Sequence, residues 1–231
     1  MVPRLMVFDM AGTTVADSGH VAGAMAETLK EAGIPARAPM LTKYLGLPKP
    51  TALRNALKDF SDPRHEEPAF IKQLHDQFTQ RMIAHFEEDR GVSEVPGAMR
   101  TFDWLHQNGC MVALDTGFSR PIANAILKRL NWVGGAIDFT VTSDEVNRGR
   151  PMPDMIFEAM KRFSIESPQH VGKIGDTPND LIQGHAAGCK WIIGVTEGSH
   201  IREQLSAYPH THLINNVGKL PQVFLEDEDY Q

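Results

Sequence analysis

The sequence predicts an α/β fold, in which a doubly wound parallel sheet carries an inserted group of helices. Residues 5–8 are four consecutive apolar residues that lead into Asp9, a pattern typical of a short buried strand in a parallel sheet. Residues from about 17 to 92 show only helical patterns. From residue 95 onward, strand-like runs alternate with helical runs, which predicts parallel strands joined by right-handed crossovers.

The inserted segment is predicted to be entirely helical. Apolar residues recur at helical spacing over residues 20–32, and Thr51 is expected to cap a helix that extends through residue 60. Residues 68–88 have an apolar residue at every fourth position. The prolines that precede Thr51 predict a loop, and Lys49 lies in this loop between two of them.

The rest of the chain is predicted to alternate strands with helices. The expected strands are residues 110–114, 139–142, 170–174, 190–195 and 211–214, and the expected helices are residues 96–108, 119–131 and 154–163, one that ends at residue 187, and a terminal helix. The sequence therefore predicts a core domain of residues 1–16 and 93–231 and a helical cap domain of residues 17–92.

The composition is ordinary for a globular protein and argues against several classes of function. The 231 residues are 42% hydrophobic and 23% charged, with a formal net charge of −6. Because no basic run is present, nucleic acid is not an expected partner. No apolar run approaches the roughly 18 residues of a membrane span. Cys110 and Cys189 lack metal-ligand spacing and are expected to be reduced, so we expect a cytoplasmic protein.

Polar residues follow three of the predicted strands at the point where each strand ends. Asp9 follows the first strand, Thr116 and Gly117 follow the second, and Asp176 follows the fourth. The carboxyl ends of parallel strands meet at one edge, where open α/β sheets bind ligands, so we expect these residues to lie close together. Arg150 precedes the fourth strand and is expected at the same edge.

This set of side chains points to metal and phosphate chemistry. Paired carboxylates at Asp9 and Asp176 suit a hard cation with oxygen ligands, above all Mg²⁺. The Thr116 hydroxyl, a backbone N–H group and the Arg150 guanidinium suit a phosphoryl group. Each residue alone has an ordinary explanation: Thr116 as a turn residue, Arg150 as a surface charge, Asp180 as an acid at a helix N-terminus. Their joint occurrence favours a functional site.

These motifs resemble those of the haloacid dehalogenase superfamily. The resemblance spans essentially the whole chain and rests on Asp9-x-x-Gly-Thr-Thr, Thr116-Gly117, Arg150-Pro151 and Gly175-Asp176-Thr177-x-x-Asp180. It implies a Rossmann-like core with a helical cap inserted after the first motif. Most phosphatases of this superfamily carry a second aspartate two residues after the first. This chain has Ala11 there, as phosphonatases do.

A second similarity to phosphonatases lies in the predicted cap. Gly46-Leu47-Pro48-Lys49 is similar to the phosphonatase motif Gly-x-x-Lys, whose lysine forms a Schiff base. The Gly-Arg-Pro form of the third motif, at residues 149–151, is similar too. The resemblance implies hydrolysis of the C–P bond of phosphonoacetaldehyde or a related carbonyl phosphonate. It also implies a homodimer that forms through the cap.

The resemblance assigns an expected role to each site residue. Asp9 is expected to attack phosphorus and form an aspartyl-phosphate, while Lys49 forms the Schiff base. The expected catalytic residues are Asp9, Lys49, Thr116, Arg150 and Asp180, the expected phosphate ligands are Thr116, Gly117 and Arg150, and the expected Mg²⁺ ligands are Asp9, the Ala11 carbonyl and Asp176.

Two residues depart from the phosphonatase pattern and leave alternatives open. Phosphonatases carry Met four residues before the lysine and His three residues after it, where this chain has Leu45 and Ala52. A different carbonyl phosphonate therefore stays open as the substrate. So does a phosphomonoesterase in which Lys49 only binds a small phosphorylated metabolite. A non-catalytic protein that binds a phosphoanion is a third hypothesis, and the intact Asp9 and Asp176 argue against it.

Overall fold

The computed structural model of the protein describes residues 2–88 and 92–226. Within them, six strands form one sheet with the order β3-β2-β1-β4-β5-β6, and every neighbouring pair is parallel. The strands are β1 (Leu5–Phe8), β2 (Met111–Thr116), β3 (Phe139–Thr142), β4 (Val171–Gly175), β5 (Trp191–Val195) and β6 (His212–Ile214). The chain winds outward in both directions from β1, so the predicted doubly wound α/β fold is confirmed.

The central strand β1 is apolar throughout because both faces of the sheet are covered. Leu5 and Val7 point into one apolar cluster, whereas Met6 and Phe8 point into the other. All four side chains are fully buried. This alternation follows from the two-residue period of a strand, and burial on both faces requires an unbroken apolar run.

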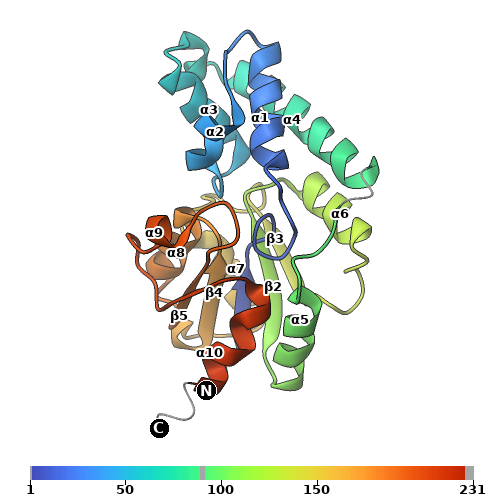
Figure 1. The fold of residues 1–231 in the computed structure, drawn as a ribbon, viewed down its shortest axis with the longest axis vertical. Helices are drawn as coiled ribbons and strands as arrows, with labels where there is room; N and C mark the ends of the chain where they lie inside the picture. Colours follow the sequence, from blue (N-terminus) through green and yellow to red (C-terminus); the bar gives the residue numbers. More distant parts are fainter. Residues whose placement is uncertain (1, 89–91, 227–231) are drawn as a thin grey trace.

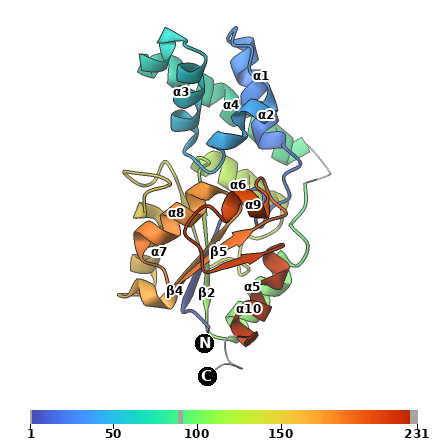
Figure 2. The same ribbon diagram turned by 60° about the vertical axis from the view of Figure 1, so that its left-hand side comes forward.

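Helices cover both faces of the sheet, as Figure 2 shows, with α7 and α8 on one side and α5 and α10 on the other. The helices of this part are α5 (Ala98–Gln107), α6 (Arg120–Arg129), α7 (Asp154–Arg162), α8 (Pro178–Ala187), α9 (Arg202–Leu205) and α10 (Leu220–Glu226). Short 3₁₀ helices occur at Thr42–Tyr44, Pro63–Glu66, Pro168–His170 and Val217–Lys219. The predicted strands and helices of this part agree with the observed ones to within a few residues at each end, whereas α9 and the 3₁₀ helices were not predicted.

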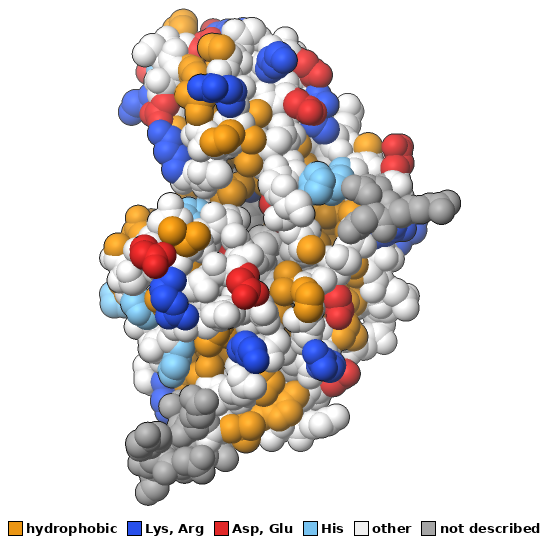
Figure 3. Space-filling model, viewed as in Figure 1, with side chains coloured by type: hydrophobic (Ala, Val, Ile, Leu, Met, Phe, Trp, Pro, Cys, Tyr) orange, Lys and Arg blue, Asp and Glu red, His pale blue; other side chains and the backbone are white. Residues whose placement is uncertain are grey.

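Four helices form a separate group above the carboxyl edge of the sheet (Figure 1). We call them the cap helices: α1 (His20–Glu31), α2 (Ala38–Leu41), α3 (Lys49–Asp59) and α4 (Pro68–Glu88). As predicted, the described part of residues 17–92 contains no strand. In Figure 3 the surface is indented where the cap helices meet the sheet, and acidic and basic side chains are interspersed on the face drawn. The domain boundaries at residues 16 and 93 stay a prediction.

One local prediction is wrong. Lys49 was expected in a loop, but it is the first residue of α3, and its side chain is buried. Pro50 lies in the first turn of this helix, where proline is tolerated because the missing N–H would have no partner within the helix. The helix therefore begins before Thr51, and its first turn points Lys49 toward the sheet.

No helix among the described residues is both long and apolar enough to cross a membrane.

Candidate active site

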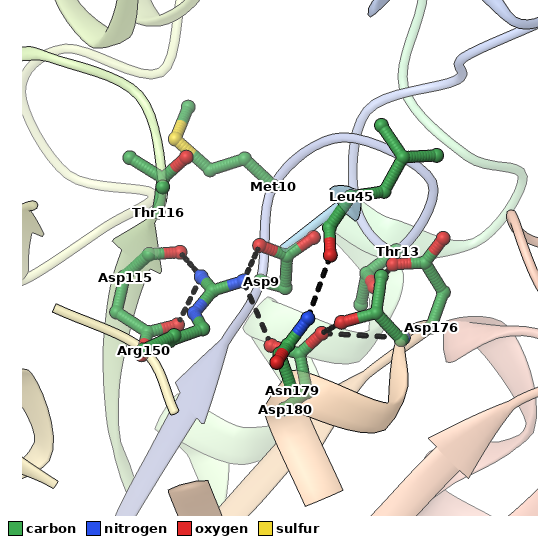
Figure 4. A network of polar contacts seen from close by, with 12 residues as sticks. Asp9, Met10, Thr13, Leu45, Asp115, Thr116, Arg150, Asp176, Asn179 and Asp180 are labelled. Atoms are coloured by element: carbon green, nitrogen blue, oxygen red, sulfur yellow. Dashed lines mark hydrogen bonds and ion pairs between the residues drawn. The ribbon is translucent and has the colours of Figure 1, made fainter. Parts of the chain in front are cut away.

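Five of the predicted site residues converge at the carboxyl edge of the sheet (Figure 4). Asp9 directly follows β1, Thr116 is the last residue of β2, and Asp176 directly follows β4. Asp180 lies in the first turn of α8, and Arg150 reaches in from the segment between β3 and α7. All five residues are buried. Arg150 is therefore not a surface charge, which was its ordinary explanation.

A tight turn fixes Asp9 in place. The Asp9 N–H group donates to the Ile174 carbonyl on β4. Three successive N–H groups, at residues 13–15, then donate to the Met10 carbonyl, and the chain doubles back. Gly12 is required in this turn, because it has a φ of +89° and a Cβ atom on it would lie 2.2 Å from Asp176 Oδ2.

A buried network of ion pairs lies beneath the site. Arg150 Nη1 lies 2.6 Å from Asp9 Oδ1 and 2.9 Å from Asp180 Oδ1. Arg150 Nη2 donates to the backbone carbonyl of Asp115 at 2.6 Å and to its Oδ1 at 2.9 Å. Lys173 on β4 pairs with Asp115 and, at 2.9 Å, with Asp180. The guanidinium thus holds the Asp9 carboxylate in one orientation.

The sequence reasoning missed Asp115 and Lys173. Both side chains are fully buried. The signal was present in the sequence, because Lys173 interrupts an apolar strand at a position that must be buried. A fully buried lysine requires an acidic partner. The sequence does not show which carboxylates face Lys173, because that depends on how the strands and α8 pack.

The charges of this network do not balance. Among the described residues, Asp9, Asp115 and Asp180 pair with two buried cations, Arg150 and Lys173, whereas the buried Asp176 has no ion-pair partner, so the carboxylates outnumber the cations paired with them. Burial is the main cause that raises the pKa of Asp9 to about 6, against the pull of Arg150. Burial, together with the charges of Asp9 and Asp180, raises the pKa of Asp176 to about 7.

The pKa of Asp180 shifts in the opposite direction to those of Asp9 and Asp176, although the three carboxylates lie together. Burial opposes ionisation of Asp180, but Arg150 and Lys173 outweigh it and hold the Asp180 pKa below its usual value. Carboxylate oxygens of Asp9, Asp176 and Asp180 all lie within 4.8 Å of one another. Three clustered carboxylates, one of them without an ion-pair partner among the described residues, fit a divalent cation with oxygen ligands.

Lys49 enters this site from the cap helices. Its side chain is 3% exposed, its Nζ donates to the Leu47 carbonyl at 3.2 Å, and Nζ lies 5.1 Å from the centre of the Phe118 ring. Burial lowers the pKa of Lys49 to about 8, although Asp9 and Asp17 oppose this effect. Because its side chain is buried, Lys49 is not a solvated loop lysine, and its catalytic role stays a prediction.

Residues 45–49 reach the sheet because glycines stand opposite them. A Cβ atom on Gly117 would lie 2.5 Å from the Leu47 carbonyl oxygen, and one on Gly149 would lie 2.5 Å from Pro48 Cγ. Asn179 Nδ2 also donates to the Leu45 carbonyl at 2.8 Å. These contacts narrow the site, and the free volume at its centre is ≈ 20 Å³. That space holds about one water molecule.

The walls of this cavity carry the remaining predicted residues and one that was missed. Ala11, Thr116 and Gly117 line it together with Asp9, Lys49 and Arg150. Asp17, which the sequence reasoning did not single out, lines it as well. Ala52 is fully buried and offers no titratable group where phosphonatases carry histidine.

Comparison with known proteins adds an independent observation. The family profile for haloacid dehalogenase-like hydrolases matches residues 3–188. A protein named phosphonoacetaldehyde hydrolase from Bacteroides fragilis is 27% identical over 95% of this chain and 88% of its own length, and one from Bacillus cereus is 31% identical over 84% of this chain and 76% of its own. A phosphonoacetaldehyde hydrolase-like protein from Oleispira antarctica has a similar fold, with a TM-score of 0.83 at 22% identity over 97% of this chain and 92% of its own.

Proposed function

We propose that this chain, which belongs to the haloacid dehalogenase-like hydrolases, cleaves the C–P bond of a small carbonyl phosphonate. The proposed reaction depends on Mg²⁺. Phosphonoacetaldehyde is the simplest substrate of this class. One observation carries the proposal: Lys49, buried and with a lowered pKa, lines the same narrow cavity as Asp9, while Ala11 stands where a catalytic acid is otherwise expected.

The pairing of Ala11 with Lys49 favours C–P cleavage over ester hydrolysis. A phosphate ester releases an alkoxide, and a general acid that protonates it contributes roughly 10²- to 10⁴-fold. Ala11 supplies no proton. A phosphonate instead releases a carbanion, which needs an electron sink rather than an acid. An iminium ion formed between Lys49 and the aldehyde carbon provides this sink.

The proposed reaction begins at Lys49. The Lys49 amine condenses with the aldehyde and releases water, which gives an iminium ion. Asp9 attacks phosphorus in line, the C–P bond breaks, and its electron pair moves into the iminium to form a neutral enamine. Water hydrolyses the aspartyl-phosphate on Asp9, while protonation and hydrolysis of the enamine release the aldehyde and Lys49.

The other site residues hold the phosphoryl group. Thr116 and Gly117 would offer a hydroxyl and a backbone N–H to its oxygens, and Arg150 would keep Asp9 aligned and neutralise charge. Mg²⁺ fits the cluster described above, where Asp9, the Ala11 carbonyl and Asp176 would hold it and Asp180 would support it. When bound, the cation supplies positive charge that stabilises the phosphoryl oxygens.

The deciding experiment measures inorganic phosphate released from phosphonoacetaldehyde in the presence of Mg²⁺. We expect phosphate release by the wild type, and loss of activity in Lys49→Arg or after sodium borohydride is added together with the substrate. Lys58→Arg is the matched control, because Lys58 lies exposed on the same helix. If borohydride does not inactivate the wild type in the presence of substrate, the Schiff-base mechanism is wrong.

A phosphomonoesterase is the second candidate, and the buried Ala52 favours it, because it removes the phosphonatase histidine. In that case Lys49 only binds substrate. A panel of phosphate esters would then be hydrolysed by the Lys49→Ala variant, whereas phosphonoacetaldehyde would be inert with the wild type.

Two further expectations accompany the proposal. A homodimer that forms through the cap helices is testable by light scattering of the wild type. A cytoplasmic location agrees with the two free cysteines, Cys110 and Cys189, both of which are buried.

A further inference from the structure

Asp17 occupies an unusual position for a residue at the start of a helix. Its Oδ1 accepts hydrogen bonds from the N–H groups of His20 at 2.7 Å and of Val21 at 3.4 Å, at the beginning of α1. Aspartate is a common residue in this capping role. However, the Asp17 side chain is only 7% exposed, and it lines the cavity that contains Lys49 and Asp9.

Asp17 and Lys49 line the same small cavity. Both side chains face a free volume of ≈ 20 Å³, which has room for about one water molecule. A single water, or the hydroxyl of an adduct on Lys49, can therefore bridge the amine and the carboxylate. The negative charge of Asp17 also favours the ammonium form of Lys49, which indicates that the two groups interact.

Elimination among the charged groups of the cavity leaves Asp17 as the one that can carry protons for the amine. The described residues that line it include four charged side chains: Asp9, Asp17, Lys49 and Arg150. Asp9 is the proposed nucleophile that attacks phosphorus. The Arg150 guanidinium stays protonated and is held by three carboxylates. The buried Ala52 offers no alternative.

We propose that Asp17 is a catalytic residue, the group that moves protons during formation and hydrolysis of the imine on Lys49. This inference rests on the proposed function, since it assigns the acid–base step of that reaction.

Every proton in this step moves between Asp17, Lys49 and the oxygen of the aldehyde. The Asp17 carboxylate takes a proton from the Lys49 ammonium, and the neutral amine adds to the aldehyde carbon. The amine proton moves to the former carbonyl oxygen, which gives a carbinolamine. Asp17 then returns its proton to this hydroxyl, the C–O bond breaks, and water leaves as the nitrogen lone pair forms the iminium ion. Ammonium and aldehyde thus become iminium and water, with Asp17 ionised again.

The test separates proton transfer from helix capping. Asp17→Asn keeps an oxygen that accepts the His20 and Val21 hydrogen bonds, since asparagine caps helices about as well as aspartate. It removes the ability to exchange protons together with the negative charge, and loss of that charge alone favours the neutral Lys49 amine and would speed trapping rather than slow it. Asp62→Asn is the matched control, because Asp62 accepts a backbone hydrogen bond at the start of a short helix in the same segment and does not line the cavity.

The readout is the rate at which borohydride and phosphonoacetaldehyde inactivate the Mg²⁺-loaded protein. We expect Asp17→Asn to be trapped about 10²-fold more slowly than the wild type, with an unchanged thermal midpoint and unchanged orthophosphate binding. Asp62→Asn is expected to be trapped at the wild-type rate. In Asp17→Ala, which leaves a small space, added formate is expected to restore part of the rate.

Each contrary outcome has a distinct meaning. If the wild type is trapped and Asp17→Asn is trapped equally fast, the role of Asp17 is refuted while the proposed function stands. If the wild type is not trapped at all, the proposed function fails first. If Asp17→Asn loses orthophosphate binding to the same extent as trapping, the change disturbs the whole site, and the inference is overturned.

Discussion

Replacing Lys49 with methionine is expected to abolish imine formation and yet make the protein more stable. Methionine has a similar length and no charge, so it removes the buried ammonium without opening a large space. A pKa that falls from 10.5 to about 8 corresponds to roughly 3 kcal/mol of unfavourable free energy for the charged form. Loss of the Leu47 hydrogen bond and of the contact with Phe118 offsets part of this gain. We expect a net increase of about 1–3 kcal/mol.

The pH dependence of this gain tests its cause. Below pH 8 the folded protein carries a charged Lys49, so the full penalty is present. Between pH 8 and pH 10.5 the unfolded chain binds a proton at Lys49 that the folded protein does not, so the stability of the wild type rises relative to that of the variant. The gain from Lys49→Met should therefore be large at pH 7 and small at pH 10.

Urea unfolding at both pH values measures the gain, with Lys58→Met as the control. Lys58 is exposed on the same helix, so its replacement should change the free energy of unfolding by less than about 0.5 kcal/mol. A Lys49→Met variant that is less stable than the wild type at pH 7 would refute the reasoning. The buried ammonium would then be a net stabilising partner of Asp9 and Asp17, and its position would be explained by structure alone.

Three further predictions concern the metal, the pH profile and the closed site. Mg²⁺ at 100 times its dissociation constant should stabilise the wild type against unfolding by about 2.7 kcal/mol, which thermal unfolding measures as a higher midpoint. Asp176→Asn should lose most of this stabilisation, because it removes a carboxylate from the cluster. The rate of imine trapping by cyanoborohydride should rise about tenfold per pH unit below pH 8 and level off above it, because only the neutral Lys49 amine reacts; a flat profile from pH 6 to pH 9 would contradict this. Gly117→Ala should slow trapping at least tenfold, since its Cβ would strike the Leu47 carbonyl. Gly23→Ala, in an open part of α1, should instead keep full activity and add about 0.5–1 kcal/mol of stability.

The sequence predicted the location of the site well because the sheet is buried on both faces. An unbroken apolar run such as residues 5–8 marks a strand, and the residue that ends it must emerge at the edge of the sheet. Topology then gathers Asp9, Thr116 and Asp176 at one edge, although more than 100 residues separate the first from the second. None of this requires knowledge of side-chain contacts.

The residues that were missed depend on contacts across the fold, whereas the error at Lys49 is local. The Lys173 partners, Asp115 and Asp180, are set by how strands and helix pack, so the sequence gives no sign of which carboxylates face the lysine. The position of Asp17 depends on how the cap helices seat on the sheet. The prolines around Lys49 suggested a loop by local propensity, but they are equally compatible with a first helical turn that points the lysine inward.

Closure of the site and activation of Lys49 are one event. The free volume at the centre of the site has room for about one water, so separation of the cap helices from the sheet would widen it for a phosphonate. Separation returns Lys49 Nζ to water, where its pKa is near 10.5. At pH 7 the neutral fraction is then roughly 1 in 3,000, compared with about 1 in 10 at a pKa of about 8. The contact of residues 45–49 with Gly117 and Gly149 buries the amine and therefore favours its neutral, reactive form. The two glycines act at a distance from the reacting atoms, because their lack of a Cβ atom permits the contact that keeps water from the amine.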